Sequence, residues 1–217
     1  MDTSALVRAI ALVVVAYLSG SLPIGVIVAR IAGGPDPRTV GSGRTGGTNA
    51  LRALGRRWAA VVVAGDVAKG ALPVLLARVV TGDSVVEIAC GLAAVVGSAR
   101  SIFLGFTGGR GVGTGVGTLL VIQPLAVLLA APVFFGVILL TRYVSLGSLI
   151  ASAAVVPAML VSWLVLRGDL PPPYLVYAAL GAALIWLNHA DNIERLRRGT
   201  ERKLDFELLA GRRPGRS

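Results

Sequence analysis

Seven apolar segments occupy most of this 217-residue chain, and they restrict it to folds that a lipid bilayer can hold. A helix that spans a bilayer needs about 20 mainly apolar residues. The segments are residues 5–29, 58–80, 84–97, 112–122, 125–140, 144–166 and 174–187. The third and fourth are short, so we expect short or broken helices around the loop 98–111. We therefore predict an all-α membrane protein, a seven-helix transmembrane bundle that forms a single domain over residues 1–217.

The first segment contains Pro23, where we expect a kink. A cleaved signal peptide is the alternative interpretation of residues 1–20. The apolar run continues to residue 29, however, and Asp2 provides no positively charged start. We therefore expect this segment to remain as the first helix.

The composition excludes several classes of protein. Only 15% of the residues are charged, against about a quarter in ordinary soluble domains, and 55% are hydrophobic. A soluble enzyme, a disordered chain and a nucleic-acid-binding protein are therefore excluded, and membrane lipids are the expected surroundings. The single cysteine, Cys90, cannot form an intrachain disulfide, and the single histidine leaves little scope for a metal site. We predict neither a metal nor a cofactor.

The basic residues predict the orientation in the membrane. With seven crossings, 17 of the 21 Lys and Arg residues fall on one side. The positive-inside rule then places the N-terminus outside and the C-terminus in the cytoplasm. Residues 195–217 form a basic cytoplasmic tail in this topology.

A glycine-rich stretch in the first cytoplasmic loop is a candidate anion site. It has the formal spacing G-x-G-x-x-G, but no strand precedes it, so a dinucleotide fold is rejected. Glycines let backbone N–H groups turn toward an anion, and neighbouring side chains add further donors. A flexible connection is the alternative. The candidate residues are Gly41, Ser42, Gly43, Thr48, Asn49 and Arg52.

A second glycine cluster precedes the fourth segment and contains Gly108, Gly109, Arg110 and Gly111. It lacks the Gly-Lys-Ser/Thr of a P-loop. A helix N-terminus attracts anions through its unpaired N–H groups. The alternative is close helix packing through small residues, and both can hold together.

Three polar pairs in or next to apolar segments share the spacing i, i+3, which places both members of each pair on one helix face. Asp66 and Lys69 can pair inside the second segment, in either a functional or a structural role. Ser145 and Ser148 begin the sixth segment, while His189 and Asn192 end the last one, as caps or as site residues. The predicted topology brings the last two pairs and both glycine loops to the cytoplasmic side. Cations and backbone donors beside an apolar bundle favour a phosphorylated substrate with a lipid chain.

Six motifs in order resemble those of the bacterial membrane acyl-phosphate:glycerol-3-phosphate acyltransferases, the PlsY family. They are residues 17–25, 41–49 with Arg52 and Gly55, 66–70, 106–114, 142–148, and 189–195 with Gly199 and Thr200. The resemblance implies a seven-helix protein of the bacterial cell membrane with its active site facing the cytoplasm. It implies acyl transfer from acyl phosphate to the 1-hydroxyl of glycerol 3-phosphate, which gives lysophosphatidic acid and phosphate in phospholipid biosynthesis. An organic-anion transporter and a catalytically altered lipid-binding paralogue are the alternatives, and a monomer is compatible with the sequence.

The resemblance also implies the site residues. The catalytic set is Ser42, Arg52, Arg110, Ser148, His189 and Asn192. The substrate-binding set is Gly41, Gly43, Thr48, Asn49, Lys69, Gly108, Gly109, Gly111 and Ser145. Arg52 and Arg110 would hold phosphates, and either the donor's own phosphate or His189 would take the proton of the attacking hydroxyl.

The sequence departs from the family pattern around the second glycine loop. Ser98 and Ser101 replace the usual His and Pro, and Arg110 and Thr107 each replace a usual Lys. Arginine keeps the charge and can bind a phosphate through two hydrogen bonds, but its reach differs from that of lysine.

Overall fold

The computed structural model describes residues 2–165 and 171–210, and all regular secondary structure within them is helical. Short 3₁₀ turns cover Pro37–Thr39 and Ile102–Leu104. The α-helices are α1 (Thr3–Ser21), α2 (Ile24–Ile31), α3 (Gly47–Leu54), α4 (Arg56–Thr81), α5 (Ser84–Ala99), α6 (Val112–Ile122), α7 (Pro124–Thr141), α8 (Val144–Val165), α9 (Pro173–Asn188), α10 (Ala190–Arg197) and α11 (Phe206–Ala210). The prediction of an all-helical protein agrees with this architecture.

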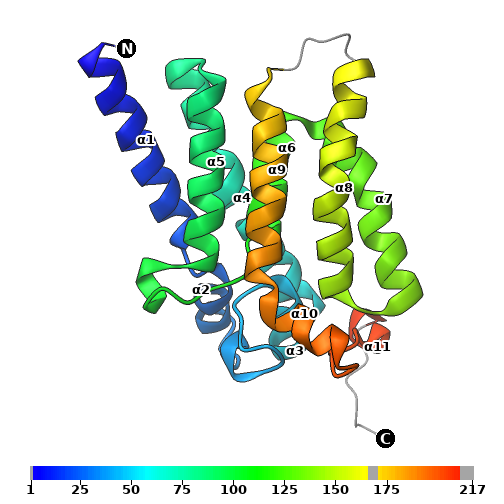
Figure 1. Cartoon of the computed structure of the whole chain (residues 1–217). Coiled ribbons are helices and arrows are strands. Elements are labelled where there is room, and N and C mark those ends of the chain that lie inside the picture. The colour runs from blue at the N-terminus through cyan, green and yellow to red at the C-terminus, as the bar shows by residue number, and fades with distance from the viewer. Residues whose placement is uncertain (1, 166–170, 211–217) are drawn as a thin grey trace, which may run out of the picture.

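Four of these helices, α1, α4, α7 and α8, are long and apolar enough to cross a bilayer, and α5, α6 and α9 are shorter apolar helices. The apolar helices run alongside one another between two ends of the molecule, with the start of α1 at one end and α10 and α11 at the other (Figure 1). With its 11 residues α6 is only about 17 Å long. Helix α6 is therefore too short to cross a bilayer by itself, and the glycine-rich loop that precedes it continues the chain toward the end of the bundle that carries α10.

The first predicted segment is two helices rather than one kinked helix. Helix α1 ends at Ser21, the chain turns at Leu22 and Pro23, and α2 starts at Ile24. Proline has no N–H to donate to the preceding turn, so a helix readily breaks there. Parts of other predictions, namely residues 166 and 211–217 and the charge at Arg167, lie outside the described residues.

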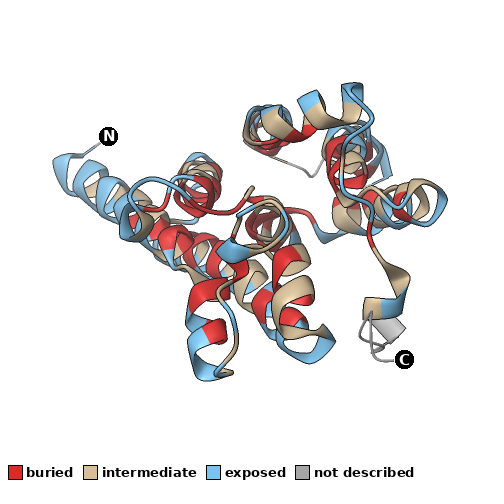
Figure 2. Cartoon of the chain, turned by 90° about the horizontal axis from the view of Figure 1, so that it is seen from below, coloured by how far each residue is buried: buried red, intermediate tan, exposed pale blue. Residues whose placement is uncertain are grey.

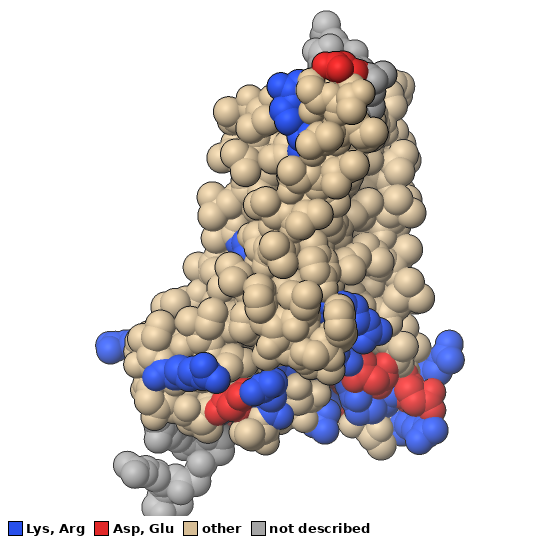
Figure 3. Space-filling model, turned by 90° about the vertical axis from the view of Figure 1, so that its left-hand side faces the viewer, with Lys and Arg blue, Asp and Glu red and all other residues tan. Residues whose placement is uncertain are grey.

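The outer faces of the apolar helices are exposed, as expected of a protein surrounded by lipid. Leu140 is 88% exposed and Val79 is 77% exposed. Buried positions lie mainly where helices meet (Figure 2). Charged residues gather mainly at the two ends of the face shown in Figure 3, most of them at the end that carries α2 and α10. The middle of the bundle therefore presents an apolar belt.

Helices α4 and α6 pack through glycines at close range. A Cβ atom at Gly70 would collide with the carbonyl oxygen of Thr114, and one at Gly117 would collide with that of Val67. Gly113 lies on the same face of α6. The close-packing interpretation of the second glycine cluster thus agrees with the structure.

Replacing Gly117 with alanine is expected to destabilise the protein by about 1–3 kcal/mol, because both colliding atoms belong to backbone. The matched control is Gly136→Ala in α7, where the new Cβ would meet no described atom within 4 Å. Alanine there should be neutral or stabilising, because glycine costs about 0.5–1 kcal/mol in a helix. Thermal unfolding in detergent measures both variants, and equal melting temperatures would contradict the packing argument.

Candidate active site

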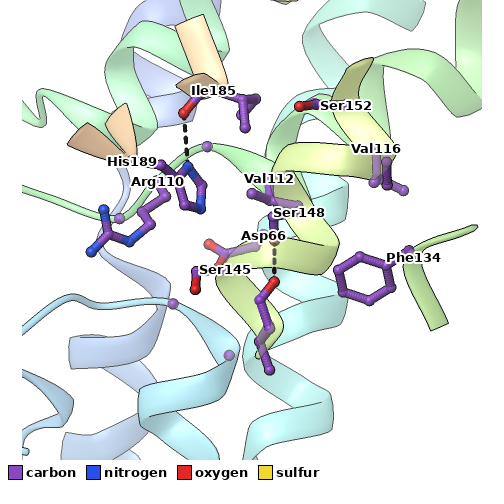
Figure 4. Close-up of a pocket in the computed structure, with 18 of the residues that line it drawn as sticks. Asp66, Arg110, Val112, Val116, Phe134, Ser145, Ser148, Ser152, Ile185 and His189 are labelled. Atoms are coloured by element: carbon purple, nitrogen blue, oxygen red, sulfur yellow. Dashed lines mark hydrogen bonds between the residues drawn. The ribbon is translucent and has the colours of Figure 1, made fainter. Parts of the chain in front are cut away.

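A cavity of about 630 Å³ is lined by residues of α4 to α9, together with residues of α3, α10 and the adjoining loops. Arg110 and His189 lie toward one side of it, and Val116 and Phe134 lie toward the other (Figure 4). The polar residues that line it are Ser42, Arg44, Thr48, Asn49, Arg52, Asp66, Ser98, Arg110, Ser145, Ser148, Ser152, Tyr177, His189, Asn192, Glu201 and Arg202. The cavity therefore joins a cationic end to an apolar end.

Asn49, on α3, organises the first glycine loop. Its Nδ2 donates to the Ser42 hydroxyl at 3.1 Å and to the Arg44 carbonyl at 2.9 Å. Its Oδ1 accepts a hydrogen bond from Arg52 Nη1 at 3.0 Å. Asn49 is itself buried. One amide thus fixes the loop and orients the guanidinium that follows one turn later.

Gly41 and Gly43 belong to the first glycine loop but do not line the cavity. Their φ angles are +57° and +70°, a region that favours glycine. A side chain at Gly41 would also press on Asn49 and Arg52. These two glycines shape the loop, whereas Thr48 lines the cavity.

Arg110 enters the cavity from the second glycine loop and is held by α10. Its Nη1 and Nη2 donate to the two carboxylate oxygens of Asp191 at 2.7 and 2.9 Å. Nη1 also donates to the carbonyl of Asn188 at 2.6 Å. This bidentate contact fixes the plane of the guanidinium.

The glycines around Arg110 have different positions. Gly109 lines the cavity and donates its N–H to the carbonyl of Ser98 at 2.8 Å. Gly111 also lines it, with a φ of +81° immediately before α6. Gly108 lies against the backbone at the end of α5, outside the lining. The loop therefore presents a glycine backbone on either side of the arginine.

Arg44 is a cavity residue that the sequence prediction missed. Its Nη1 donates to the carbonyl of Gly108 at 3.5 Å, which connects the two glycine loops. Burial, and then the charge of Arg110, lower the pKa of Arg44. Its position inside the first glycine motif was the available signal.

Glu201 is a second missed residue, and it connects the two predicted serine and asparagine sites. Its Oε1 accepts from the Ser145 hydroxyl at 2.9 Å and from Asn192 Nδ2 at 2.7 Å. Its Oε2 accepts from Arg195 Nε at 2.7 Å. The Glu201 side chain is only 7% exposed. An acid directly after the last family motif, in an otherwise basic tail, was the available signal.

Part of the predicted basic tail, residues 195–217, is built into the site. Glu201 and Arg202 line the cavity. Leu204 donates its N–H to the carbonyl of Arg142 at 2.7 Å, and Arg142 Nε donates to the carbonyl of Leu204 at 3.0 Å. The described part of the tail therefore docks against the turn between α7 and α8.

Ser148 and His189 both make local hydrogen bonds. The Ser148 hydroxyl donates to the carbonyl of Val144 at 3.0 Å. His189 Nδ1 lies 2.7 Å from the carbonyl of Ile185, so Nδ1 carries the proton and Nε2 is the free acceptor. Burial lowers the pKa of His189 to about 4, and the charge of Arg110 contributes in the same direction. The imidazole is therefore neutral at pH 7.

The low pKa of His189 predicts a loss of stability in acid. Because the folded-state pKa of about 4 is below the ordinary value of 6.5, the unfolded chain binds more protons between these pH values. The free energy of unfolding should fall by about 3 kcal/mol as the pH decreases from 6.5 to 4. His189→Gln removes the only histidine, so its thermal unfolding should lack this part of the pH dependence. Parallel pH profiles for both proteins would contradict the assignment.

Lys69 was predicted to bind substrate, but its ammonium group contacts other parts of the protein and does not line the cavity. Its Nζ lies 2.8 Å from Asp66 Oδ1 and donates to the carbonyl of Leu22 at 3.1 Å. Asp66 lines the cavity, whereas Lys69 does not. The ammonium thus holds the break between α1 and α2 against α4.

Most of the predicted site residues meet in this one cavity. Those that line it are Ser42, Thr48, Asn49, Arg52, Gly109, Arg110, Gly111, Ser145, Ser148, His189 and Asn192. Those outside the lining are Gly41, Gly43, Lys69 and Gly108.

The structure shows the surroundings of Ser98 and Ser101, the residues that replace the usual His and Pro of the family. Ser98 is buried at the end of α5 and lines the cavity. Ser101 donates its hydroxyl to the carbonyl of Ser21 at 2.6 Å and its N–H to the carbonyl of Thr107 at 3.2 Å. A serine in place of proline therefore connects the end of α1 to the second loop.

The fold and the cavity define a multi-pass membrane protein with a cavity in which arginine side chains adjoin an apolar slot. The family model for glycerol-3-phosphate acyltransferase matches residues 10–199. The chain is 45% identical to the glycerol-3-phosphate acyltransferase of Geobacter sulfurreducens over 88% of its length and 95% of that protein. It is 45% identical to the corresponding protein of Thermus thermophilus over 90% of its length and 94% of that protein.

Solved structures give the same result. The crystal structure of PlsY, an integral membrane glycerol 3-phosphate acyltransferase, in its glycerol 3-phosphate form superposes with a TM-score of 0.85 at 36% identity. That match covers 94% of this chain and all of the other. The lysophosphatidic acid form of PlsY gives a TM-score of 0.83 at 35% identity, with the same coverage. This chain belongs to the glycerol-3-phosphate acyltransferase family, which confirms the resemblance of its motifs.

Proposed function

We propose that this protein transfers an acyl group from acyl phosphate to the 1-hydroxyl of glycerol 3-phosphate. The hydroxyl oxygen forms an ester bond with the acyl carbon, the bond from that carbon to the phosphate oxygen breaks, and lysophosphatidic acid and phosphate leave. The observation that carries the proposal is the single cavity in which four arginines adjoin an apolar slot. Two phosphorylated substrates and one acyl chain need such a combination.

The arginines are suited to two phosphate groups at once. Among the described residues, the Arg52 side chain makes one hydrogen bond, to Asn49, although a guanidinium has five N–H donors. Arg44 and Arg202 add charge to the same end of the cavity. Arg110 is shared with Asp191, and a phosphate would compete for its donors.

Proton transfer is assigned to the donor's own phosphate. The pKa of His189 is about 4, whereas the donor's phosphate gains basicity as the anhydride bond breaks and inorganic phosphate forms, which makes the leaving phosphate the stronger base. His189 Nε2 can still orient a hydroxyl. The rate enhancement then comes from positioning, at best about 7–11 kcal/mol, and from glycine-loop N–H groups at the oxyanion, about 3–4 kcal/mol for each donor.

The proposed topology has seven crossings, with the N-terminus outside, the C-terminus in the cytoplasm and the cavity's polar end facing the cytoplasm of a bacterial cell. The basic residues support this orientation, since most of those visible in Figure 3 lie at the end of the bundle that carries α2 and α10. Reagents that label single engineered cysteines from one side of intact cells test it.

The decisive assay combines the purified protein, acyl phosphate and labelled glycerol 3-phosphate. We expect equal amounts of lysophosphatidic acid and inorganic phosphate, and none with acyl-CoA as donor. Flux of the anion into liposomes without any product would favour a transporter instead. The absence of both activities would favour a lipid-binding paralogue.

A further inference from the structure

Asp66 is a carboxylate inside the apolar helix α4, and only one of its two oxygens is paired with another described residue. Lys69 occupies Oδ1 at 2.8 Å, and no described residue forms a hydrogen bond with Oδ2. The Asp66 side chain is 15% exposed and lines the cavity, whereas the Lys69 side chain is 5% exposed and does not line it. The remaining accessible surface of the carboxylate therefore borders the cavity.

The position of this carboxylate is fixed from two sides. Lys69 is itself held by the carbonyl of Leu22 at 3.1 Å. On the side of α6, Gly113 packs closely against Asp66: a Cβ atom there would lie 3.0 Å from Asp66 Cβ. Asp66 lies between Arg110 and Phe134 in Figure 4, at the junction of the polar and apolar ends.

The cavity needs an acceptor at this junction. Its polar end is rich in donors, which suit phosphate oxygens, but a glycerol backbone carries two hydroxyl groups that must donate. Acceptors in the described cavity lining include Asp66 Oδ2, His189 Nε2 and the buried, unpartnered Asn192 Oδ1, and of these three only Asp66 is a carboxylate. Ser145 and Asn192 Nδ2 already donate to Glu201.

We infer that Asp66 accepts a hydrogen bond from the hydroxyl of glycerol 3-phosphate that is not acylated. The inference rests on the proposed function and makes Asp66 a specificity-determining residue. Lys69 occupies Oδ1 and leaves Oδ2 open, so the carboxylate can accept a hydrogen bond from a hydroxyl while its ion pair stays intact. A site built to bind a hydroxyl rejects an analogue without it, because its polar group is then left unpaired.

The test compares glycerol 3-phosphate with 3-hydroxypropyl phosphate, which keeps the phosphate and the reacting hydroxyl but lacks the other one. The wild-type enzyme is expected to prefer glycerol 3-phosphate about 10- to 100-fold in kcat/KM, as for a hydrogen bond to a charged group. Asp66→Leu combined with Lys69→Gln removes both charges and keeps a donor for Leu22. This double variant should lose the preference while its kcat/KM for the analogue stays within about threefold of the wild-type value.

The control is Arg78→Met combined with Glu87→Gln, which removes another ion pair of α4, at 2.8 Å and outside the cavity lining. It should keep the full preference. Calorimetric binding of the two compounds without acyl phosphate gives the same comparison for a variant that folds but does not turn over.

Three results would overturn the inference: no preference in the wild type, a retained preference in the Asp66 variant, or an equal loss with both compounds, which would indicate a general base. Failure of the proposed function is a separate result. In that case the wild-type protein would make no lysophosphatidic acid from either compound.

Discussion

Replacing Arg52 with alanine should lower kcat/KM by about 100- to 1,000-fold. Removing one partner of a buried charge pair typically costs 2–5 kcal/mol, and Arg52 has most of its donors available for a phosphate. Steady-state kinetics with each substrate varied in turn measures the loss. The substrate with the larger loss identifies the phosphate that Arg52 binds. Arg52→Lys should lose less, about 10-fold, because it keeps the charge but not the planar fork.

Arg56→Ala is the matched control for this experiment. Arg56 begins the next helix, is exposed and lies outside the cavity lining. Its removal changes the net charge equally, so it should leave kcat/KM within about twofold. Equal effects of the two substitutions would mean that Arg52 acts only through the general charge of this surface.

Glu201→Ala should be the most destabilising of the substitutions considered. It leaves Arg195 with one partner fewer and removes the acceptor of Ser145 and Asn192. Breaking a buried pair costs about 3–5 kcal/mol, which is about 10 °C or more in melting temperature. Activity measured well below that temperature should also fall about 100-fold, because Asn192 and Ser145 lose their orientation.

Glu194→Ala provides the comparison on α10. Its ion pair with Arg198 is exposed and therefore worth less than about 1 kcal/mol. Glu201→Gln keeps an acceptor for the two donors and should be intermediate in stability and rate. If the Glu201→Ala protein were as stable as the Glu194→Ala protein, the hydrogen bonds from Ser145, Asn192 and Arg195 to Glu201 would not contribute to stability.

Hydropathy predicted the positions of the apolar helices closely. The fourth segment coincides with α6, and residues 125–140 and 174–187 lie within one residue of α7 and α9 at each end. Gly111, Pro124 and Pro173 stand at or directly before the starts of these three helices, so local chemistry was sufficient there. The break between α1 and α2 was underestimated, because it depends on Lys69, which reaches the Leu22 carbonyl from a distant helix.

The site was predicted less completely, for a similar reason. Its glycine loops and polar pairs could be found because they are contiguous in the sequence. Arg44 contacts Gly108 and Glu201 contacts Ser145, and both of these partners are distant in the chain. Local composition assigned Glu201 to a basic tail.

The location of Glu201 after α10 also has a consequence for biosynthesis. The chain emerges from the ribosome N-terminus first, so α1 to α8 can enter the bilayer before this residue leaves the ribosome. Until it docks, Ser145 and Asn192 lack their shared partner. Catalytic competence is therefore acquired last, after the membrane helices have inserted, and a released chain that ends before residue 201 should be inserted but inactive.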